Sequence, residues 1–371
     1  MSAVRIVPAL LACLVLSGCS PDDTPDPTQA APTGLDLANV ETIAGGLEIP
    51  WELAFVNENT ILVTERPGRV RVVEGGQLRA EPVAEIDVRR DGEAGLLGIA
   101  LHPGFPDERF AYVYYTSAED NRVSRFPLDG GLRFGAEEVI LDGIPAGRIH
   151  DGGRIAFGPD GMLYVGTGDA AQPELAAELG SLGGKILRIL PDGSTPDDNP
   201  FPNSPVYSYG HRNVQGFAWD SRDRMYASEH GPSGELDLCC HDELNRIEAG
   251  SFYGWPYRAG NSRAGDGSPP AEAVAPLAES GDDVWAPAGV AVYEEDGEVI
   301  LFVANLRGER VQSFTLDSDT VAPTTALDGL GRLRAARLGP DGCLYLTTSN
   351  RDGRGTPRGE DDRVARACSA D

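Results

Sequence analysis

The chain has 371 residues and a formal net charge of −27 at pH 7, with 46 glycines and 28 prolines. So acidic a chain is a poor partner for nucleic acid, whose phosphates require a basic surface. The many glycines and prolines, with almost no long helical periodicity, favour short strands joined by turns.

Residues 1–18 predict a secretory signal of the lipoprotein type. Arg5 gives a basic start, Val7–Leu16 is apolar but too short to span a bilayer, and small residues precede Cys19. This stretch resembles a bacterial lipoprotein cleavage site, which implies a lipid on Cys19. An ordinary signal peptide with an incidental cysteine is the alternative.

The segment that follows, residues 19–36, is rich in Pro, Asp and Thr and predicts a disordered tether. No later apolar run is long enough to span a membrane. We therefore expect an exported cell-envelope lipoprotein that contacts the membrane only through the lipid on Cys19.

A strand–turn–strand phrase recurs in residues 37–371. Gly158–Val165 reads GPDGMLYV and Gly339–Leu346 reads GPDGCLYL, with looser versions at Phe55–Leu62 and Trp219–Tyr226. Pro-Asp-Gly favours a tight turn because proline fixes φ and glycine accepts a positive φ.

Strand-like runs at Phe110–Tyr115 and Val299–Ala304 complete the series. Steps of about fifty residues between second strands predict an all-β fold, a six-bladed β-propeller of four-stranded antiparallel blades. The expected second strands contain Leu62, Val113, Tyr164, Tyr226, Leu301 and Tyr345.

Four cysteines follow the signal and Cys19: Cys239, Cys240, Cys343 and Cys368. An exported chain permits disulfides, and a Cys343–Cys368 bridge would tie the C-terminus to a neighbouring strand. The adjacent Cys239 and Cys240 could form a vicinal disulfide, or bind a transition metal together with His241. The sequence leaves this pairing open.

Dense polar loops separate several of the apolar strands, and they indicate a pocket for an anionic ligand. They are His150–Arg154 (HDGGR), His211–Gly216 (HRNVQG) and Glu229–Pro232 (EHGP). A propeller sends the loops of different blades to one central face, so these segments can converge.

Several phrases together resemble the soluble quinoprotein sugar dehydrogenases, the glucose/sorbosone dehydrogenase family. In chain order they are GLLGIALHP at 95–103, GGKILR at 183–188, GHRN at 210–213, EHGP at 229–232, YGWP at 253–256 and NRDGRG at 350–355. The resemblance covers nearly all of the chain after the tether. It implies a six-bladed propeller that uses pyrroloquinoline quinone (PQQ) and calcium to oxidise aldose sugars to lactones and passes electrons to an external acceptor.

The resemblance also implies roles for particular residues. His150 falls on the family's general base, and Arg212 would stabilise the charge that develops on the quinone. Arginine forks match the carboxylates of such a cofactor. The implied cofactor-binding residues are Glu93, His150, Arg212, Asn213, His230, Leu306, Arg307, Arg332 and Arg334. Calcium prefers oxygen ligands and is implied at Gly231, Pro232, Asp242, Glu243 and Tyr253.

The chain departs from the family at several points. Glu93 stands where the family usually has Gln, Ile149 where a member has Asp, and Arg307 where the glucose enzyme has Lys. Ser233–His241 is an insertion. Because a carboxylate at 93 would repel an anionic cofactor unless it is protonated or paired, two other functions stay open: a non-catalytic sugar- or protein-binding propeller, and a calcium-dependent lactonase-type hydrolase. The four arginines at the implied cofactor positions favour the dehydrogenase. They are Arg212, Arg307, Arg332 and Arg334. The sugar, the acceptor and the oligomeric state are not determined by the sequence.

Overall fold

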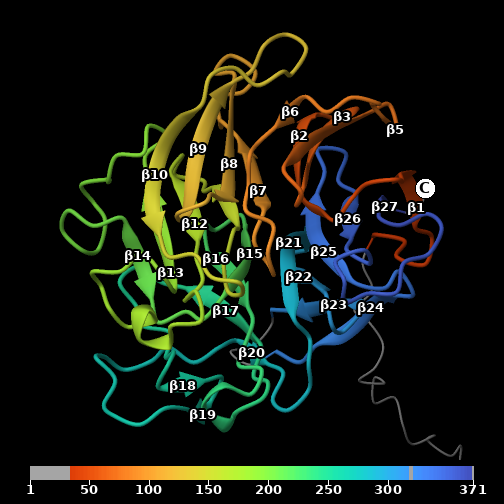
Figure 1. The fold of residues 1–371 in the computed structure, drawn as a ribbon. Coiled ribbons are helices and arrows are strands. Elements are labelled where there is room, and N and C mark those ends of the chain that lie inside the picture. The colour runs from red at the N-terminus through yellow and green to blue at the C-terminus, as the bar shows by residue number, and fades with distance from the viewer. Residues whose placement is uncertain (1–33, 317–320, 370–371) are drawn as a thin grey trace, which may run out of the picture.

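The computed structural model describes residues 34–316 and 321–369, which form six antiparallel β-sheets around a common centre (Figure 1). The predicted signal at 1–18, Cys19 and the tether up to residue 33 lie outside the described residues. Gly34 donates its amide to Glu295, and Leu35 pairs with Ser369. No helix in the described ranges is long and apolar enough to cross a membrane.

Each sheet contains four strands that follow one another outward from the centre. The first sheet contains β2 (Pro50–Asn57), β3 (Thr60–Glu65), β4 (Arg69–Glu74) and β5 (Gln77–Leu78), with β6 (Ala84–Glu85) as an additional strand on β4. The second contains β7 (Leu96–Leu101), β8 (Phe110–Thr116), β9 (Asn121–Pro127) and β10 (Glu138–Ile144). The third contains β11 (Ile155–Phe157), β12 (Leu163–Gly166), β13 (Lys185–Ile189) and β14 (Val206–Tyr209).

The other three sheets repeat this arrangement. They are β15 (Val214–Trp219), β16 (Met225–Glu229), β17 (Glu243–Ile247) and β20 (Ala278–Glu279); β21 (Pro287–Glu295), β22 (Glu298–Asn305), β23 (Arg310–Thr315) and β24 (Thr324–Asp328); and β25 (Leu333–Leu338), β26 (Leu344–Thr348), β27 (Val364–Ala367) and β1 (Glu41–Ala44). A small hairpin, β18 (Arg258–Ala259) with β19 (Ser262–Arg263), and two short 3₁₀ helices, η1 (Pro173–Ala176) and η2 (Glu235–Asp237), lie in the loops.

The six-bladed propeller predicted from the repeat is confirmed, and every expected second strand is in place. Leu62, Val113, Tyr164, Tyr226, Leu301 and Tyr345 lie on β3, β8, β12, β16, β22 and β26 respectively. The sheets touch in a closed ring, since β2 contacts both β7 and β25, and β21 contacts both β15 and β25. The third sheet completes the ring, with β11 against β7 and β12 against β15.

The Pro-Asp-Gly turns have a common internal structure. Gly161 and Gly342 both have φ +76°, in the left-handed region that favours glycine. The aspartate before each glycine accepts a hydrogen bond from a tyrosine hydroxyl on the following strand, at 3.0 Å from Tyr164 and 2.9 Å from Tyr345. The sequence phrase is thus a turn fastened to the strand it introduces.

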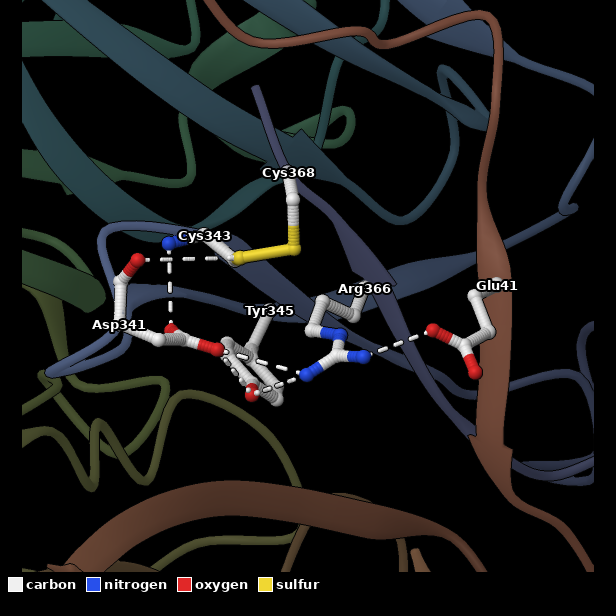
Figure 2. The surroundings of a disulfide bond; sticks show 6 residues. All are labelled: Glu41, Asp341, Cys343, Tyr345, Arg366 and Cys368. Carbon is white, nitrogen blue, oxygen red and sulfur yellow. Dashed lines mark hydrogen bonds and ion pairs between the residues drawn. A yellow bond between two sulfur atoms is a disulfide. The ribbon is translucent and has the colours of Figure 1, made fainter. Parts of the chain in front are cut away.

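The sixth sheet combines both ends of the described chain. Strand β1 pairs with β27, with Glu41 opposite Arg366, and these two side chains also form an ion pair at 2.8 Å. Figure 2 shows that this pair lies beside the disulfide between Cys343 and Cys368, which fastens β27 to the turn before β26. The Cys343–Cys368 bridge expected from the sequence is therefore present.

Charged side chains fill part of the ring's centre. Glu52 and Arg154 are fully buried and form a direct ion pair, and Arg337 donates to the same carboxylate at 3.1 Å. The Trp51 ring contacts two guanidinium groups, at 4.4 Å from Arg154 and 5.3 Å from Arg334. A buried charge requires a partner, so this network fixes how the inner strands meet.

Candidate functional site

A cavity of about 420 Å³ lies where loops beside β7, β11, β15, β16, β22 and β25 converge. Seven residues predicted to bind the cofactor line it: Glu93, His150, Arg212, His230, Leu306, Arg307 and Arg332. Gly231, Pro232 and Asp242, from the predicted calcium set, line it as well. Loops more than 200 residues apart in sequence therefore form one wall, as the fold predicted.

Four predicted residues are not among the lining residues in the described part of the chain: Asn213, Arg334, Glu243 and Tyr253. Asn213 is buried next to the cavity, where its Oδ1 accepts hydrogen bonds from the Gly152 amide and from Gln215. Arg334 donates to Gln215 at 2.5 Å. Asn213 thus supports the Gly152 amide, and both side chains fix the side chain of Gln215.

His150 is held by contacts on both ring nitrogens. Its Nδ1 lies 2.6 Å from Asp169 Oδ1, and its Nε2 lies 2.8 Å from Nη2 of Arg212. The other oxygen of Asp169 accepts a hydrogen bond from the Trp255 indole at 2.8 Å. A carboxylate on Nδ1 keeps the proton there, so Nε2 is left as the basic nitrogen facing the cavity.

The backbone of His150 is also unusual. Its φ is +61°, which is rare for a residue with a Cβ, and its amide donates to Oε2 of Glu93 at 3.0 Å. The carbonyl accepts the Ala170 amide at 3.1 Å. Such a conformation persists only where the surroundings define it, and it is typical of functional sites.

Arg212 connects the base to the opposite wall of the cavity. One Nη donates to the His230 carbonyl at 3.1 Å, and the other contacts Glu235 at 2.6 Å as well as His150. Its guanidinium lies over the Trp255 ring at 5.7 Å. The side chain is 4% exposed, so its position is fixed by these contacts.

Three buried nitrogen atoms around the cavity have no hydrogen-bond partner among the described residues: Nε of Arg212, Nδ2 of Asn213 and Nε2 of His230. Burial lowers the pKa of His230 to about 3, so its ring is neutral at pH 7. Unpaired buried polar groups are costly and rare. Two of the three belong to residues that line the cavity, Arg212 and His230, and they favour a polar ligand there.

The cavity lining is slightly cationic within a strongly acidic chain. Arg212, Arg307, Arg332 and Arg354 face three carboxylates, those of Glu93, Glu235 and Asp242. Arg332 forms an ion pair with Asp352 at 2.8 Å and donates to the Leu306 carbonyl at 3.1 Å, which holds its fork in place.

Glu93, the departure from the family that raised doubt, is paired. Arg354 lies 3.2 Å from its Oε1, and the His150 amide binds its Oε2. Burial opposes the ionisation of Glu93, but His230 (charged only in acid), the His150 amide and Arg354 outweigh it and lower its pKa to about 2. The carboxylate is thus ionised, and the nearby charge of Arg354 balances it, which reduces its repulsion of an anionic ligand.

The predicted calcium ligands fall into two groups. At the cavity, Asp242 accepts the amides of Gly231, Trp285 and Ala286, so both its oxygens already have partners. A Cβ on Gly231 would collide with the Cys240 carbonyl, so this wall requires glycine.

The second group is centred on Glu243, the first residue of β17, which lies opposite Glu229 at the end of β16. Asn245 donates to both Glu243 at 2.9 Å and Glu229 at 3.0 Å, while its own Oδ1 is buried without a partner among the described residues. Burial raises the pKa of Glu229 to about 7, and burial together with Glu229 raises the pKa of Glu243 far above its ordinary value. Tyr253 stacks on His211 at 4.6 Å, and its hydroxyl donates to the Arg246 carbonyl.

The sulfur atoms of Cys239 and Cys240 are bonded to each other, and both residues line the cavity. This excludes the alternative in which their thiolates bind a transition metal with His241, whose ring instead contacts Glu279 at 3.2 Å. Across the described ranges, the one cluster of three potential metal-binding side chains is Asp341, Cys343 and Cys368, and its two sulfurs form the second disulfide.

Sequence reasoning missed four residues of the site: Asp169, Trp255, Glu235 and Arg354. Trp255 and Arg354 lie inside recognised phrases, YGWP and NRDGRG, but were given no role. Asp169 closely follows β12, the strand paired with β11 after His150, and this neighbouring position is the signal that could have found it. Glu235 lies in the insertion and left no signal.

Comparison with known proteins gives consistent results. The sequence profile of the family described as Glucose / Sorbosone dehydrogenase matches residues 47–356. The aldose sugar dehydrogenase YliI of Escherichia coli is 30% identical over 343 residues, covering 85% of this chain and 91% of that protein. Quinoprotein glucose dehydrogenase B of Acinetobacter calcoaceticus is 31% identical over 271 residues, covering 63% and 55%.

A similar solved structure is the PQQ-bound form of an aldose sugar dehydrogenase from Streptomyces coelicolor. It is 43% identical, with a TM-score of 0.79, and the match covers 89% of this chain and 98% of that one. The likeness extends over the whole propeller.

Proposed function

The chain belongs to the glucose/sorbosone dehydrogenase family, and from that membership we propose that it oxidises the C1 hydroxyl of aldose sugars to a lactone, with PQQ as hydride acceptor and calcium as metal. The observation that carries the proposal is the His150–Asp169 pair at the cavity, with Arg212 against the basic nitrogen. A hydrolase would not require the surrounding arginines, whereas a tricarboxylate cofactor does.

The residues present fit such a cofactor. The unpartnered nitrogens of Arg212, Asn213 and His230 are donors or acceptors for its oxygen and nitrogen atoms, and Arg307, Arg332 and Arg354 supply positive charge. Arg354 pairs with Glu93, so the lining still offers positive charge to an anionic cofactor. When bound, PQQ supplies the two-electron acceptor that no side chain provides.

The protein's part in the reaction is proton transfer and orientation. A sugar hydroxyl at Nε2 of His150 loses its proton to the imidazole, and Asp169 stabilises the imidazolium that forms. Trp255 keeps Asp169 in position through its indole N–H. Arg212 stabilises negative charge next to the base.

Calcium fits the oxygen atoms near β16 and β17. Glu229 and Glu243 are buried carboxylates whose pKa values are raised by burial and, for Glu243, also by Glu229, and Asn245 Oδ1 is an unused acceptor beside them among the described residues. A hard cation with oxygen ligands would satisfy all three. We infer that Glu243, with Glu229 and Asn245, holds one calcium, and that the Gly231 and Pro232 carbonyls are ligands at the cavity.

We further propose that residues 1–18 direct export, that Cys19 carries a lipid, and that an external acceptor takes the electrons outside the cytoplasmic membrane. Two disulfides among the described cysteines are consistent with an oxidising compartment.

Reconstitution tests the proposed function. Apoprotein purified after chelation should gain an absorbance change on titration with PQQ and CaCl₂, and should then reduce a dye when aldoses are added. His150→Gln should lower turnover roughly 10²–10⁴-fold without loss of the absorbance change. Lactone hydrolysis without PQQ, or no absorbance change at high PQQ, would refute the proposal.

A further inference from the structure

The segment Ser233–His241, between β16 and β17, brings a carboxylate to the predicted base. Glu235 Oε1 lies 2.6 Å from Nη2 of Arg212 and 3.6 Å from Nε2 of His150. This is the segment interpreted from the sequence as an insertion between the EHGP phrase and Asp242.

The loop holds Glu235 at several points. The Gly234 amide donates to the Leu238 carbonyl at 2.9 Å, and the Ser233 amide donates to the second oxygen of Glu235. The Cys239–Cys240 disulfide follows, and the amides of Cys240 and His241 both donate to the Gly281 carbonyl, at 3.2 and 2.8 Å. The carboxylate is therefore positioned by its backbone and does not depend on Arg212 alone.

Of the three carboxylates in the described cavity lining, Glu235 differs in what it faces. Glu93 is taken by Arg354 and the His150 amide, and Asp242 is taken by three backbone amides. The Glu235 side chain is 31% exposed and lies next to the basic nitrogen. Burial opposes its ionisation, but Arg212 and the Ser233 amide lower its pKa, so it is ionised and its charge offsets the positive charge that Arg212 presents next to the base.

Any hydroxyl that reaches Nε2 of His150 must come within a few ångströms of Glu235. A carboxylate accepts hydrogen bonds from sugar hydroxyls well, and it repels a second negative charge at this range. Arg212 keeps its Nε for another acceptor, so a ligand there need not displace Glu235.

We propose that Glu235 is a specificity residue that admits neutral and amino aldoses and excludes aldoses bearing a carboxylate or phosphate. This inference rests on the proposed function and names its substrate class. A hydroxyl beside the reacting carbon donates to Glu235, while an acidic sugar meets its charge. Specificity is then set by repulsion of the wrong substrate as well as attraction of the right one.

The test uses full-length protein loaded with PQQ and calcium, and compares glucose, glucosamine and glucuronate. For the wild type, kcat/KM for glucuronate should be at least about tenfold below that for glucose, given one like charge at short range. Glu235→Gln should raise the glucuronate-to-glucose ratio about tenfold, mainly through KM, because it removes the charge and keeps an acceptor. Glu235→Asp should restore part of the discrimination.

Asp237→Asn is the matched control, since it removes one carboxylate from the same loop at an exposed position. It should leave the ratio unchanged. PQQ titration by absorbance is measured for each variant in parallel. If PQQ binds and glucose is oxidised but Glu235→Gln leaves the ratio unchanged, only this inference is wrong. If PQQ binds and no aldose is oxidised, the proposed function is wrong and this inference with it.

Discussion

Nδ1 of His150 lies 2.6 Å from Oδ1 of Asp169, and the opposite oxygen of that aspartate is held by the Trp255 indole. The three residues come from three separate loops, and together they determine which ring nitrogen faces the cavity. The tautomer of the base is thus set by residues that need not touch a substrate.

Asp169→Asn should test this arrangement. The amide would favour the wrong tautomer of His150, so we expect kcat to fall roughly 10²–10⁴-fold. PQQ affinity, measured by absorbance titration, should change little. Trp255→Phe, which removes only the support of Asp169, should have a smaller effect on kcat. A kcat for Asp169→Asn close to that of the wild type would contradict the assigned role.

The lowered pKa of Glu93 predicts that acid reduces the stability of the folded protein. Glu93 has its pKa lowered from the ordinary 4.5 to about 2 in the folded chain. Its contribution to stability is therefore fully present above pH 4.5 and is lost as the pH falls towards 2. Since the side chain is 22% exposed, about 3 kcal/mol is an upper limit.

Urea unfolding measures this effect. Glu93→Gln should be less stable than the wild type at pH 5 to 7, and the difference should shrink as the pH approaches 2. A difference that stays constant over that range would show that the ionised form of Glu93 is not what stabilises the fold.

Calcium should stabilise the protein in a pH-dependent way. Burial raises the pKa of Glu229 to about 7, so a cation bound to Glu229 and Glu243 has to displace protons below that pH. Added CaCl₂ should therefore raise the melting temperature more at pH 8 than at pH 5. Glu243→Gln should abolish much of the shift, whereas Glu41→Gln on the surface should not.

The buried ion pair at the hub makes Glu52 sensitive to substitution. Glu52→Gln leaves the Arg154 guanidinium in the centre of the ring without its charge partner, which should cost about 3–5 kcal/mol of unfolding free energy. The exposed pair of Arg366 with Glu41 should contribute less than about 1 kcal/mol when broken by Glu41→Gln. Equal losses in chemical denaturation would argue against an ionic hub.

The Cys343–Cys368 disulfide should stabilise the sixth sheet. It joins residues 25 apart, for which loop-closure entropy gives about 3.5 kcal/mol at most. Replacing both cysteines by serine should lower the unfolding free energy by up to that amount and leave PQQ binding intact. No change in the denaturation midpoint would mean that β1 and β27 hold the sheet together unaided.

The sequence predicted the propeller because its turns are chemically explicit: Pro-Asp-Gly followed by an apolar strand marks a blade wherever it occurs. It also predicted which loops converge, because a ring places all of them at one centre. It was harder to predict which individual side chains line the cavity. Arg332 and Arg334 were both expected to bind the cofactor, yet only Arg332 lines the cavity in the described chain.

The reason is local. Arg332 precedes β25, and the pairing of β25 with β26 shifts register between Leu333 and Ala336, so strict alternation does not apply. Asp169 and Glu235 escaped prediction for a different reason. Each acts on a residue more than eighteen positions away, and no local spacing records such a contact.

The pairing of β1 with β27 has a consequence for biogenesis. The sixth sheet cannot gain its outermost strand until residues 364–367 have been made, so a chain that stops before them keeps one gap in its ring. In such a chain β1 lacks its partner and the ring stays open. The pairing of β1 with β27 is thus the step that closes the ring.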